Sequence, residues 1–569
     1  FILTVLTLWS TAGAWEPAEG PLMTRWAKDI KPSEVHAEYP RPQMKRKEWK
    51  NLNGLWEYAV TDVDSSRPSE FKGGILVPFC IESALSGVGK RIGPKKKLWY
   101  KRTFTIPEKW TGKNILLHFG AVDWDTTVWV NNKEVISHRG GYDPFTADIT
   151  EALTDKGPQT IILSVWDPSD AGYQPCGKQV RSPGGIYYTP VTGIWQTVWL
   201  EPVGKNYIKR IKITPDTDNE QVKLMVMAAE NGNVRIEIKK GLFSPKIKAE
   251  GKTAVEITIP IEEPRLWSPD SPFLYDLEVT LKNKEGRRTD TVKSYFGMRK
   301  ISLKKDKAGI NRFFLNGRPL FHYGPLDQGW WPDGLYTPAS DEALKHDLKI
   351  IKKAGCNMLR KHVKVSPARL YYWCDKMGLM VWQDMPNGDR HIDRDQPDLA
   401  RTAESARQFE LEWKSIIESL YNHPSIVFWI PFNEGWGQYD TERITEYTRK
   451  LDPTRLVISA SGWVDRDTGD AMDVHKYPGP GMPDMEEVGD DRAAVLGEFG
   501  GLGLPVKGHT WQEGSNWGYQ SFTTSEELTE GYLSLIEVLD GLVEKGLAAA
   551  IYTQTSDVEI EVNGWLTYD

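Results

Sequence analysis

Cysteine, net charge and long apolar runs are all scarce in this sequence. The four cysteines lie far apart without a Cys-x-x-Cys motif, which argues against a zinc site and a dense disulfide framework and leaves one disulfide open. A net charge of −7 over 569 residues provides no basic field for nucleic acid. No internal apolar run reaches the ~20 residues of a membrane-spanning helix. We therefore expect neither a nucleic-acid partner nor a membrane partner.

The first residues, "FILTVLTLWSTAGA" (1–14), form a short apolar stretch that ends in small residues. Such a stretch resembles the apolar region and cleavage site of a signal peptide whose charged start is missing. This pattern predicts export to the periplasm or to the outside of the cell. A buried N-terminal strand is the alternative, and residues 1–14 are left out of the fold prediction.

Length and strand patterning predict several domains. The chain is too long for one core, and about three domains of ~100–200 residues are expected. Short alternating strands with Asn/Gly turns dominate residues 22–204, which predicts a β-sandwich. A second segment of this kind, residues 205–300, predicts an immunoglobulin-like β-sandwich. The 24 tryptophans fit either core packing in such domains or the stacking of sugar rings.

After residue 300, apolar strands alternate with amphipathic helices, which predicts a (β/α)8 TIM barrel over residues 301–569. Eight strands are expected, at 319–324, 358–362, 380–384, 426–434, 456–461, 473–477, 494–500 and 549–554. Some helices between strands 5 and 7 are expected to be short or absent. The predicted fold class is therefore a multidomain β plus α/β protein.

Polar residues end these strands, on the barrel face where the active sites of such barrels lie. They are His322, Arg360, His362, Asp384, Asn433, Glu434, His475, Tyr477, Glu498 and Gln554. Glu434 and Glu498 each follow a long apolar run, so we expect both to be poorly hydrated and to need partners. Two carboxyl groups that face one cavity are the minimum for glycoside hydrolysis, which needs a protonated acid and an ionised group beneath the anomeric carbon.

Several ordered motifs resemble those of glycoside hydrolase family 2, which includes β-galactosidases, β-glucuronidases and β-mannosidases. "FNEGWG" and "LGEFGG" are similar to its acid/base and nucleophile segments. "GGYDPFTADIT" and "GIWQTVWLE" resemble its sugar-binding jelly-roll domain, and "LWSPDSPFLYDLEV" resembles its immunoglobulin-like domain. The resemblance covers nearly the whole chain after residue 40 and implies that the first sandwich is a jelly roll.

The resemblance also implies roles for single residues. Glu434 corresponds to the general acid/base and Glu498 to the nucleophile of a retaining mechanism, while Asn433 would hold the sugar 2-hydroxyl. Tyr477 would orient the nucleophile. Arg360 would keep the nucleophile ionised, with an internal salt bridge as the alternative role.

Further strand ends and aromatic residues are expected to contact the substrate. These candidates are His362, Asp384, His475, Trp436, Trp511 and Gln554. Packing is the alternative role for each tryptophan. The carbohydrate substrate is the one partner that these residues indicate.

The sequence departs from the family pattern in several places. His362 sits one position earlier than the family histidine and does not inherit its role. The Glu-x-His magnesium motif of β-galactosidases is missing, so neither a metal nor a cofactor is predicted. The Asn-x-Lys with which glucuronidases bind the sugar carboxylate is also missing, because that region reads "DVEIEVNGWLTYD". Its acidic residues Asp557, Glu559 and Glu561 predict a solvated loop, with a rim that binds a cation or hydroxyls as the alternative.

Together these features predict a retaining, exo-acting β-glycosidase that removes terminal sugars from oligo- or polysaccharides and is β-galactosidase-like. A β-glucuronidase, β-mannosidase or arabinosidase of the same family is the alternative. A metal-dependent hydrolase is disfavoured, because strand 1 offers only His322 and strand 5 offers no histidine. A non-catalytic carbohydrate-binding protein is the rival from another class. The sequence leaves open whether the protein forms a homo-oligomer.

Overall fold

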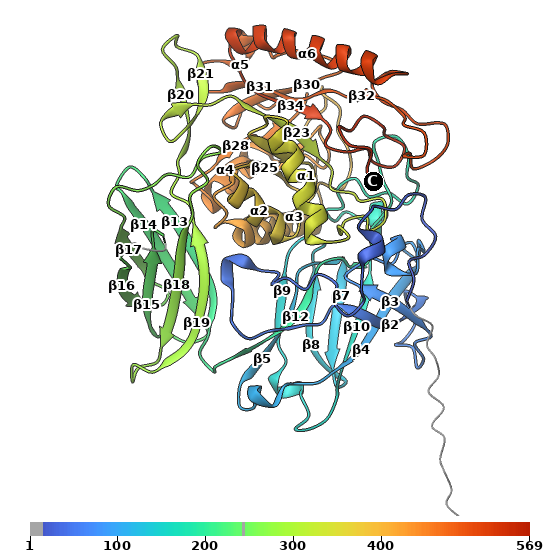
Figure 1. Cartoon of the computed structure of the whole chain (residues 1–569), viewed down its shortest axis with the longest axis vertical. Coiled ribbons are helices and arrows are strands. Elements are labelled where there is room, and N and C mark those ends of the chain that lie inside the picture. Colours follow the sequence, from blue (N-terminus) through green and yellow to red (C-terminus); the bar gives the residue numbers. More distant parts are fainter. Residues whose placement is uncertain (1–14, 242–244) are drawn as a thin grey trace, which may run out of the picture.

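The computed structural model describes residues 15–241 and 245–569, so the predicted signal-peptide segment, residues 1–14, lies outside the described residues. Two β-rich domains, blue to green in Figure 1, lie beside a barrel that is yellow to red. In the described part of the chain, no helix is long and apolar enough to cross a membrane. All four cysteines are free thiols, so the disulfide that the sequence left open is absent.

The N-terminal domain is a sandwich of two antiparallel sheets, as predicted. Inward side chains such as Trp56, Leu117 and Leu163 form its single core, because buried and exposed residues alternate along the strands. The four-stranded sheet has the order β1 (Lys50–Asn51), β12 (Val198–Val203), β5 (Asn114–Phe119) and β9 (Phe145–Asp148). The six-stranded sheet has the order β3 (Gly73–Val77), β2 (Gly54–Asp62), β4 (Lys96–Phe104), β10 (Gln159–Trp166), β7 (Asp125–Val130) and β8 (Lys133–Arg139). A short pair, β6 (Val122–Asp123) and β11 (Gly193–Ile194), lies beside them.

The second domain is a smaller antiparallel sandwich with a separate aliphatic core. Its three-stranded sheet has the order β13 (Ile208–Asp216), β14 (Gln221–Ala228) and β17 (Glu256–Pro260). Its four-stranded sheet has the order β16 (Ile247–Lys252), β15 (Asn233–Lys239), β18 (Tyr275–Lys282) and β19 (Arg288–Phe296). The predicted immunoglobulin-like sandwich is therefore present.

A small sheet leads from this sandwich into the barrel. It comprises β20 (Ile301–Lys305), β21 (Asn311–Leu315) and β22 (Arg318–Pro319). Phe313 of β21 packs against Trp382 and Phe428, which come from two barrel strands. The sheet therefore extends the barrel core at the end where the strands begin.

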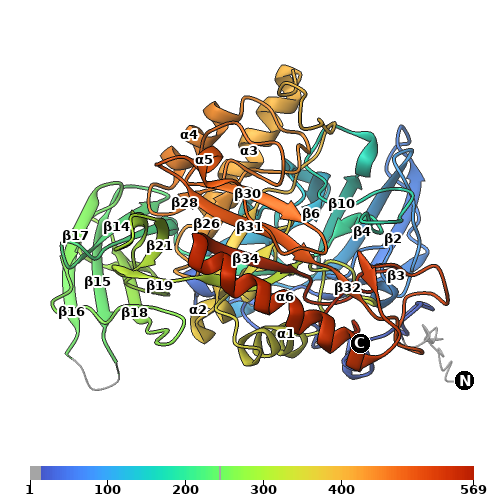
Figure 2. The ribbon, with the colours of Figure 1, turned by 90° about the horizontal axis from the view of Figure 1, so that it is seen from above.

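Eight parallel strands form a nearly closed barrel, as predicted. They have the order β28 (Leu456–Val457), β26 (Ile426–Ile430), β25 (Met380–Asp384), β24 (Met358–Lys361), β23 (His322–Asp327), β34 (Leu547–Thr553), β31 (Ala493–Gly500) and β30 (Ala471–Lys476). The short parallel pair β27 (Phe432–Asn433) and β29 (Ala460–Ser461) continues two strands toward the carboxyl end, and β32 (Leu502–Gly503) pairs with β33 (Gln520–Ser521) above the seventh strand. Figure 2 shows α6 (Ser525–Lys545) running alongside β34, with β31 and β30 beyond that strand.

Three long barrel helices begin at side-chain N-caps. Ser340, Thr402 and Thr524 each accept a backbone N–H at a helix start. The other helices are α1 (Asp341–Lys353), α2 (Ala368–Met377), α3 (Ala403–Leu420), α4 (Thr441–Leu451) and α5 (Met485–Val488). Between β29 and β30 the chain forms no helix, and α5 has only four residues. The prediction that helices between strands 5 and 7 are short or absent is therefore confirmed.

The predicted position of strand 1 was wrong by three residues, and the error changes where His322 lies in the barrel. Residues 318–319 form the hairpin strand β22, so the barrel strand begins at His322 instead of ending near it. The imidazole is fully buried, and its Nδ1 accepts a hydrogen bond of 3.1 Å from the Trp382 indole. His322 therefore belongs to the barrel core, at the opposite end from the mouth.

Candidate active site

The fourth strand ends in a tight turn that positions Glu434. Pro431 separates β26 from β27, since proline has no N–H to continue the ladder. Glu434 has a φ of +51°, a conformation uncommon outside glycine, and its N–H donates to the Ser461 carbonyl at 2.8 Å. A side chain at Gly435 would meet the Ile392 carbonyl at 2.3 Å. The backbone turns away there, and the Glu434 carboxylate remains directed into the barrel mouth.

Donors and positive charge surround Glu498 on β31. Tyr477 donates to its Oε2 at 2.6 Å, while Arg360 Nη1 and His362 Nε2 lie 3.5 and 3.2 Å from its Oε1. Burial alone would raise the pKa of Glu498, but His475, His362 and Arg360 outweigh burial and hold this pKa well below its usual range. Glu498 is therefore the ionised carboxylate of the mouth.

The two glutamates are close together across the mouth. One oxygen of Glu434, one oxygen of Glu498 and a ring nitrogen of His475 all lie within 4.8 Å of one another. A separation of ~5–5.5 Å suits a nucleophile and a general acid/base, whereas ~6.5–9.5 Å leaves room for an attacking water. These three atoms could also hold a metal ion. An ion there would bind both carboxylates and leave neither free to act as a nucleophile or an acid.

His475 links the two glutamates to a third carboxylate, that of Asp473, through Ser461. Its Nδ1 lies 2.8 Å from Glu434 Oε1 and 3.6 Å from Glu498 Oε1, and its Nε2 lies 2.8 Å from Ser461 Oγ. Ser461 donates to Asp473 at 2.6 Å, which leaves its oxygen free to accept from His475. Burial lowers the pKa of His475, but the surrounding carboxylates outweigh burial, and the net shift is upward. His475 therefore keeps its proton to a higher pH than a free imidazole, and its Nδ1–H can donate to Glu434.

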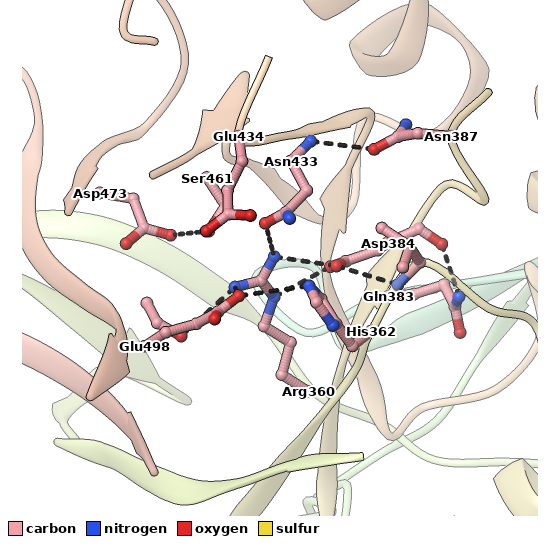
Figure 3. Close-up of polar contacts among 12 residues, drawn as sticks. Arg360, His362, Gln383, Asp384, Asn387, Asn433, Glu434, Ser461, Asp473 and Glu498 are labelled. Carbon is pink, nitrogen blue, oxygen red and sulfur yellow. Dashed lines mark hydrogen bonds and ion pairs between the residues drawn. The ribbon is translucent and has the colours of Figure 1, made fainter. Parts of the chain in front are cut away.

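Arg360 ties the second, third and fourth strand ends together (Figure 3). It donates to both oxygens of Asp384, at 3.1 and 2.9 Å, and to Asn433 Oδ1 at 2.8 Å. The second Asp384 oxygen also accepts from the Val363 N–H. Asp384 thus faces Arg360, whereas the buried Asn433 amide nitrogen has no partner among the described residues. That nitrogen is free to donate to a bound sugar.

His362 is oriented by Gln328. The Nδ1 atom of His362 lies 2.9 Å from the Gln328 Oε1, and the Gln328 amide nitrogen has no partner among the described residues. Turning the amide over would supply a donor to Nδ1 and place the imidazole proton on Nε2, which faces Glu498. Burial lowers the pKa of His362 to about 3, so the ring is neutral. His362 can therefore donate to Glu498 without carrying charge.

The remaining residues predicted to contact the substrate differ in their relation to the two glutamates. Trp436 follows Glu434 by two residues and stacks against Tyr187 of the N-terminal domain, with ring centroids 5.4 Å apart. Gln554 directly follows β34 and donates to Asn563 at 2.8 Å. Trp511 packs near Tyr568, and no described contact joins it to either glutamate. The structure thus brings Trp436 to the site and leaves Trp511 outside it.

Three family models match consecutive parts of the chain. Glycosyl hydrolases family 2, sugar binding domain, matches residues 90–191; Glycosyl hydrolases family 2 matches 206–299; and Glycosyl hydrolases family 2, TIM barrel domain, matches 312–487. The chain belongs to glycoside hydrolase family 2.

Individual relatives of this family 2 protein carry two names. A β-galactosidase from Thermoanaerobacter pseudethanolicus is 27% identical over 433 residues, which cover 71% of this chain and 54% of the relative. A β-glucuronidase from Bacteroides fragilis is 25% identical over 390 residues, which cover 64% and 54%. The chain spans about half the length of these curated relatives. The solved β-D-glucuronidase of Dictyoglomus thermophilum shares the fold, with a TM-score of 0.71, 20% identity and coverage of 91% and 92%.

The acidic cluster after the last barrel strand contradicts the predicted solvated loop. Asp557, Glu559 and Glu561 are each at most 5% exposed. Glu559 accepts from the Thr189 N–H at 2.7 Å, and Glu561 accepts from the Tyr188 hydroxyl at 2.5 Å. The cluster anchors the N-terminal domain to the barrel of this family 2 protein, a contact that spans about 370 residues of sequence.

Sequence reasoning missed four residues beside the predicted glutamates. They are Gln328, Ser461, Asp473 and Thr553, the last of which lies 2.7 Å from the Tyr477 hydroxyl. Ser461 and Thr553 end their strands, so the rule that selected the other strand ends could have found both. Asp473 lies within its strand, two residues before His475, and alternation along the strand places both side chains on one face.

Proposed function

We propose that this chain is a retaining, exo-acting β-glycosidase and that its preferred substrate is a β-glucuronide. The observation that carries the reaction type is the spacing of one oxygen each of Glu434 and Glu498, within 4.8 Å of one another. This spacing fits attack by a carboxylate better than attack by an intervening water.

In the first step, Glu498 attacks the anomeric carbon while the proton held by Glu434 and His475 passes to the leaving oxygen. The glycosidic C–O bond breaks, and the sugar becomes covalently bound to Glu498. In the second step, Glu434 takes a proton from water, whose oxygen displaces Glu498. Two inversions at one carbon give a product with the starting β configuration.

The neighbours of Glu498 suit this sequence of charges. Arg360 and Tyr477 stabilise the carboxylate before attack and as it departs in the second step. The free Asn433 amide nitrogen lies where a sugar hydroxyl can accept its hydrogen bond. Such a contact is more favourable in the transition state, when the ring carries positive charge.

The choice of sugar rests on the relatives, which are named for both β-glucuronides and β-galactosides. Two of the three proteins described above are β-glucuronidases, so we favour the glucuronide over the β-galactoside that the sequence predicted. The β-mannosides and arabinosides remain comparison substrates. Export, predicted from residues 1–14, is likewise a proposal.

A panel of 4-nitrophenyl glycosides tests this proposal. We expect kcat/KM to be highest for the β-glucuronide among β-glucuronide, β-galactoside, β-mannoside and arabinoside. Proton NMR of the fresh hydrolysate should show the β anomer first, and an initial α anomer would contradict the role of Glu498. Sugar binding without turnover by the wild-type protein would instead support the non-catalytic carbohydrate-binding alternative.

A further inference from the structure

A largely buried lysine from the N-terminal domain, Lys178, reaches the rim of the barrel mouth, and its ammonium has aromatic rings but no hydrogen-bond or ion-pair partner near it among the described residues. Lys178 is 4% exposed, yet none of the described residues forms a hydrogen bond or an ion pair within 4.0 Å with its ammonium. Two other buried lysines differ: Lys361 pairs with Asp327 at 2.9 Å, and Lys364 donates to the Tyr336 carbonyl at 3.1 Å. The Lys178 ammonium faces only the Tyr188 and Trp436 rings, so its N–H groups are available to a bound anion.

The backbone around Lys178 is clamped onto the barrel. The N–H groups of Cys176 and Gly177 both donate to the Asn387 carbonyl, at 2.9 and 2.7 Å. Gly177 has a φ of +61°, and a side chain there would meet the Val363 carbonyl at 2.6 Å. The position of Lys178 is therefore set by the loops after the second and third barrel strands.

The same clamp connects Lys178 to the strand that carries Glu434. The side-chain oxygen of Asn387 accepts from the Asn433 N–H at 3.0 Å. The Lys178 ammonium lies 5.9 Å from the Trp436 ring centroid and 5.4 Å from that of Tyr188. Its charge also acts on His362, the neighbour of Glu498. Lys178 thus lies beside Trp436, two residues from Glu434, at the barrel mouth.

Lys178 could instead have a purely structural role, in which its charge balances that of a buried carboxylate. Glu561 is the candidate, because the Lys178 charge acts on it. Glu561 already accepts from Tyr188 at 2.5 Å and from Asn563 at 2.9 Å. No ion pair within 4.0 Å joins Glu561 to the Lys178 ammonium in the described part of the chain, so the Lys178 N–H groups remain unused. A buried donor with unused N–H groups at a sugar site is suited to an anionic substituent.

We propose that Lys178 is a specificity residue that binds the carboxylate of a terminal uronic acid. This inference rests on the proposed function, because it assigns the charged group of the sugar to a residue of the N-terminal domain. It also accounts for a barrel that lacks the Asn-x-Lys motif after its last strand. The first sandwich domain then contributes directly to substrate selection.

The test compares two substrates that differ at one carbon, 4-nitrophenyl β-glucuronide and 4-nitrophenyl β-glucoside. We expect Lys178→Met to lower kcat/KM for the glucuronide by about 10- to 100-fold, mainly through KM, because a hydrogen bond to a charged group is lost. The neutral glucoside should change less than about threefold. Lys178→Arg should restore part of the glucuronide activity. Arg181→Met is the matched control, since Arg181 lies in the same segment but is exposed and paired with Asp170.

Thermal unfolding separates binding from a structural role. Lys178→Met should leave the midpoint unchanged or raise it, since it removes a buried charge without a partner. Equal losses on both substrates, or a lowered midpoint that accounts for the lost activity, would overturn this role while the proposed function stands. Turnover of neutral β-glycosides by the wild type without turnover of the glucuronide would overturn the proposed sugar and this role with it.

Discussion

The two glutamates of the mouth occupy opposite kinds of surroundings, although each ends a buried apolar strand. Glu498 has a cation, a tyrosine hydroxyl and an imidazole directed at it. Glu434 has the shared imidazole of His475 as its close polar neighbour and stands in a left-handed backbone turn. The groups around Glu498 stabilise negative charge, whereas Glu434 faces an imidazole that can share a proton with it. The comparison teaches that residue type alone does not assign catalytic roles, since neighbouring charges separate two chemically identical groups.

Removing the charge of Glu498 should have the largest effect. We expect Glu498→Gln to lower kcat at least about 10⁴-fold on natural and activated glycosides alike, because both need the covalent step. Glu412→Gln is the control: burial raises the pKa of this α3 carboxyl to about 7, and the residue lies away from the mouth. With Glu498→Ala, azide should yield the α-glycosyl azide. Wild-type turnover by Glu498→Gln would remove this mouth as the active site.

Removing Glu434 should give a loss that depends on the leaving group. We expect Glu434→Ala to reduce hydrolysis of natural glycosides by about 10³-fold, within the range for a lost general acid. Glycosides with a good phenolate leaving group should lose far less in the first step. Azide should partly restore turnover and give the β-glycosyl azide, identified by NMR. If Glu434→Ala and Glu498→Ala exchange these behaviours, the two roles are reversed.

Tyr477→Phe should make the surroundings of Glu498 less favourable to negative charge, with a smaller loss of activity than removal of either glutamate. The change removes a 2.6 Å hydrogen bond to Glu498, so kcat/KM should fall about 10- to 100-fold. Loss of this donor raises the pKa of Glu498, and the acidic limb of the pH–rate profile should move to higher pH. Tyr323→Phe is a control, because that hydroxyl contacts Tyr532 of α6. An unmoved acidic limb would show that Tyr477 does not stabilise the charge.

The pH profile offers the finest test of the comparison. Activity requires Glu498 ionised and a proton on the Glu434–His475 pair. The pKa of Glu498 is lowered, so the acidic limb should lie below ~4.3; the pKa of His475 is raised, so the alkaline limb should lie above ~6.5. An acidic limb above ~4.3 or an alkaline limb below ~6.5 would contradict these charge assignments.

Asp473→Asn should shift only the alkaline limb, because Asp473 helps to raise the pKa of His475. The limb should move to lower pH, with less than about threefold change at the plateau, since asparagine still accepts from Ser461. The exposed Asp490→Asn carries the same change in net charge and should leave the profile in place. An alkaline limb that moves upward would exclude this role for Asp473.

Much of the fold and the centre of the site could be predicted because both follow local rules. Strand periodicity located the barrel strands β25 and β31 within one residue of their observed bounds. The break at Pro431 and the turn at Gly435 then delivered Glu434 to the mouth. The error at His322 arose because a hairpin strand and a barrel strand adjoin there, and both read as one apolar run.

By itself, the sequence determined the order of the domains, the family and the two glutamates, since these depend on neighbouring residues and on the rule that barrel strands end at one face. Only the tertiary structure decided which charges surround each glutamate. It buried Glu559 and Glu561 against the first sandwich, and it carried Lys178 to the mouth of a barrel that begins more than a hundred residues later. The physical reason is that packing across domains sets burial and pairing, and burial and pairing decide which charges are stable and where.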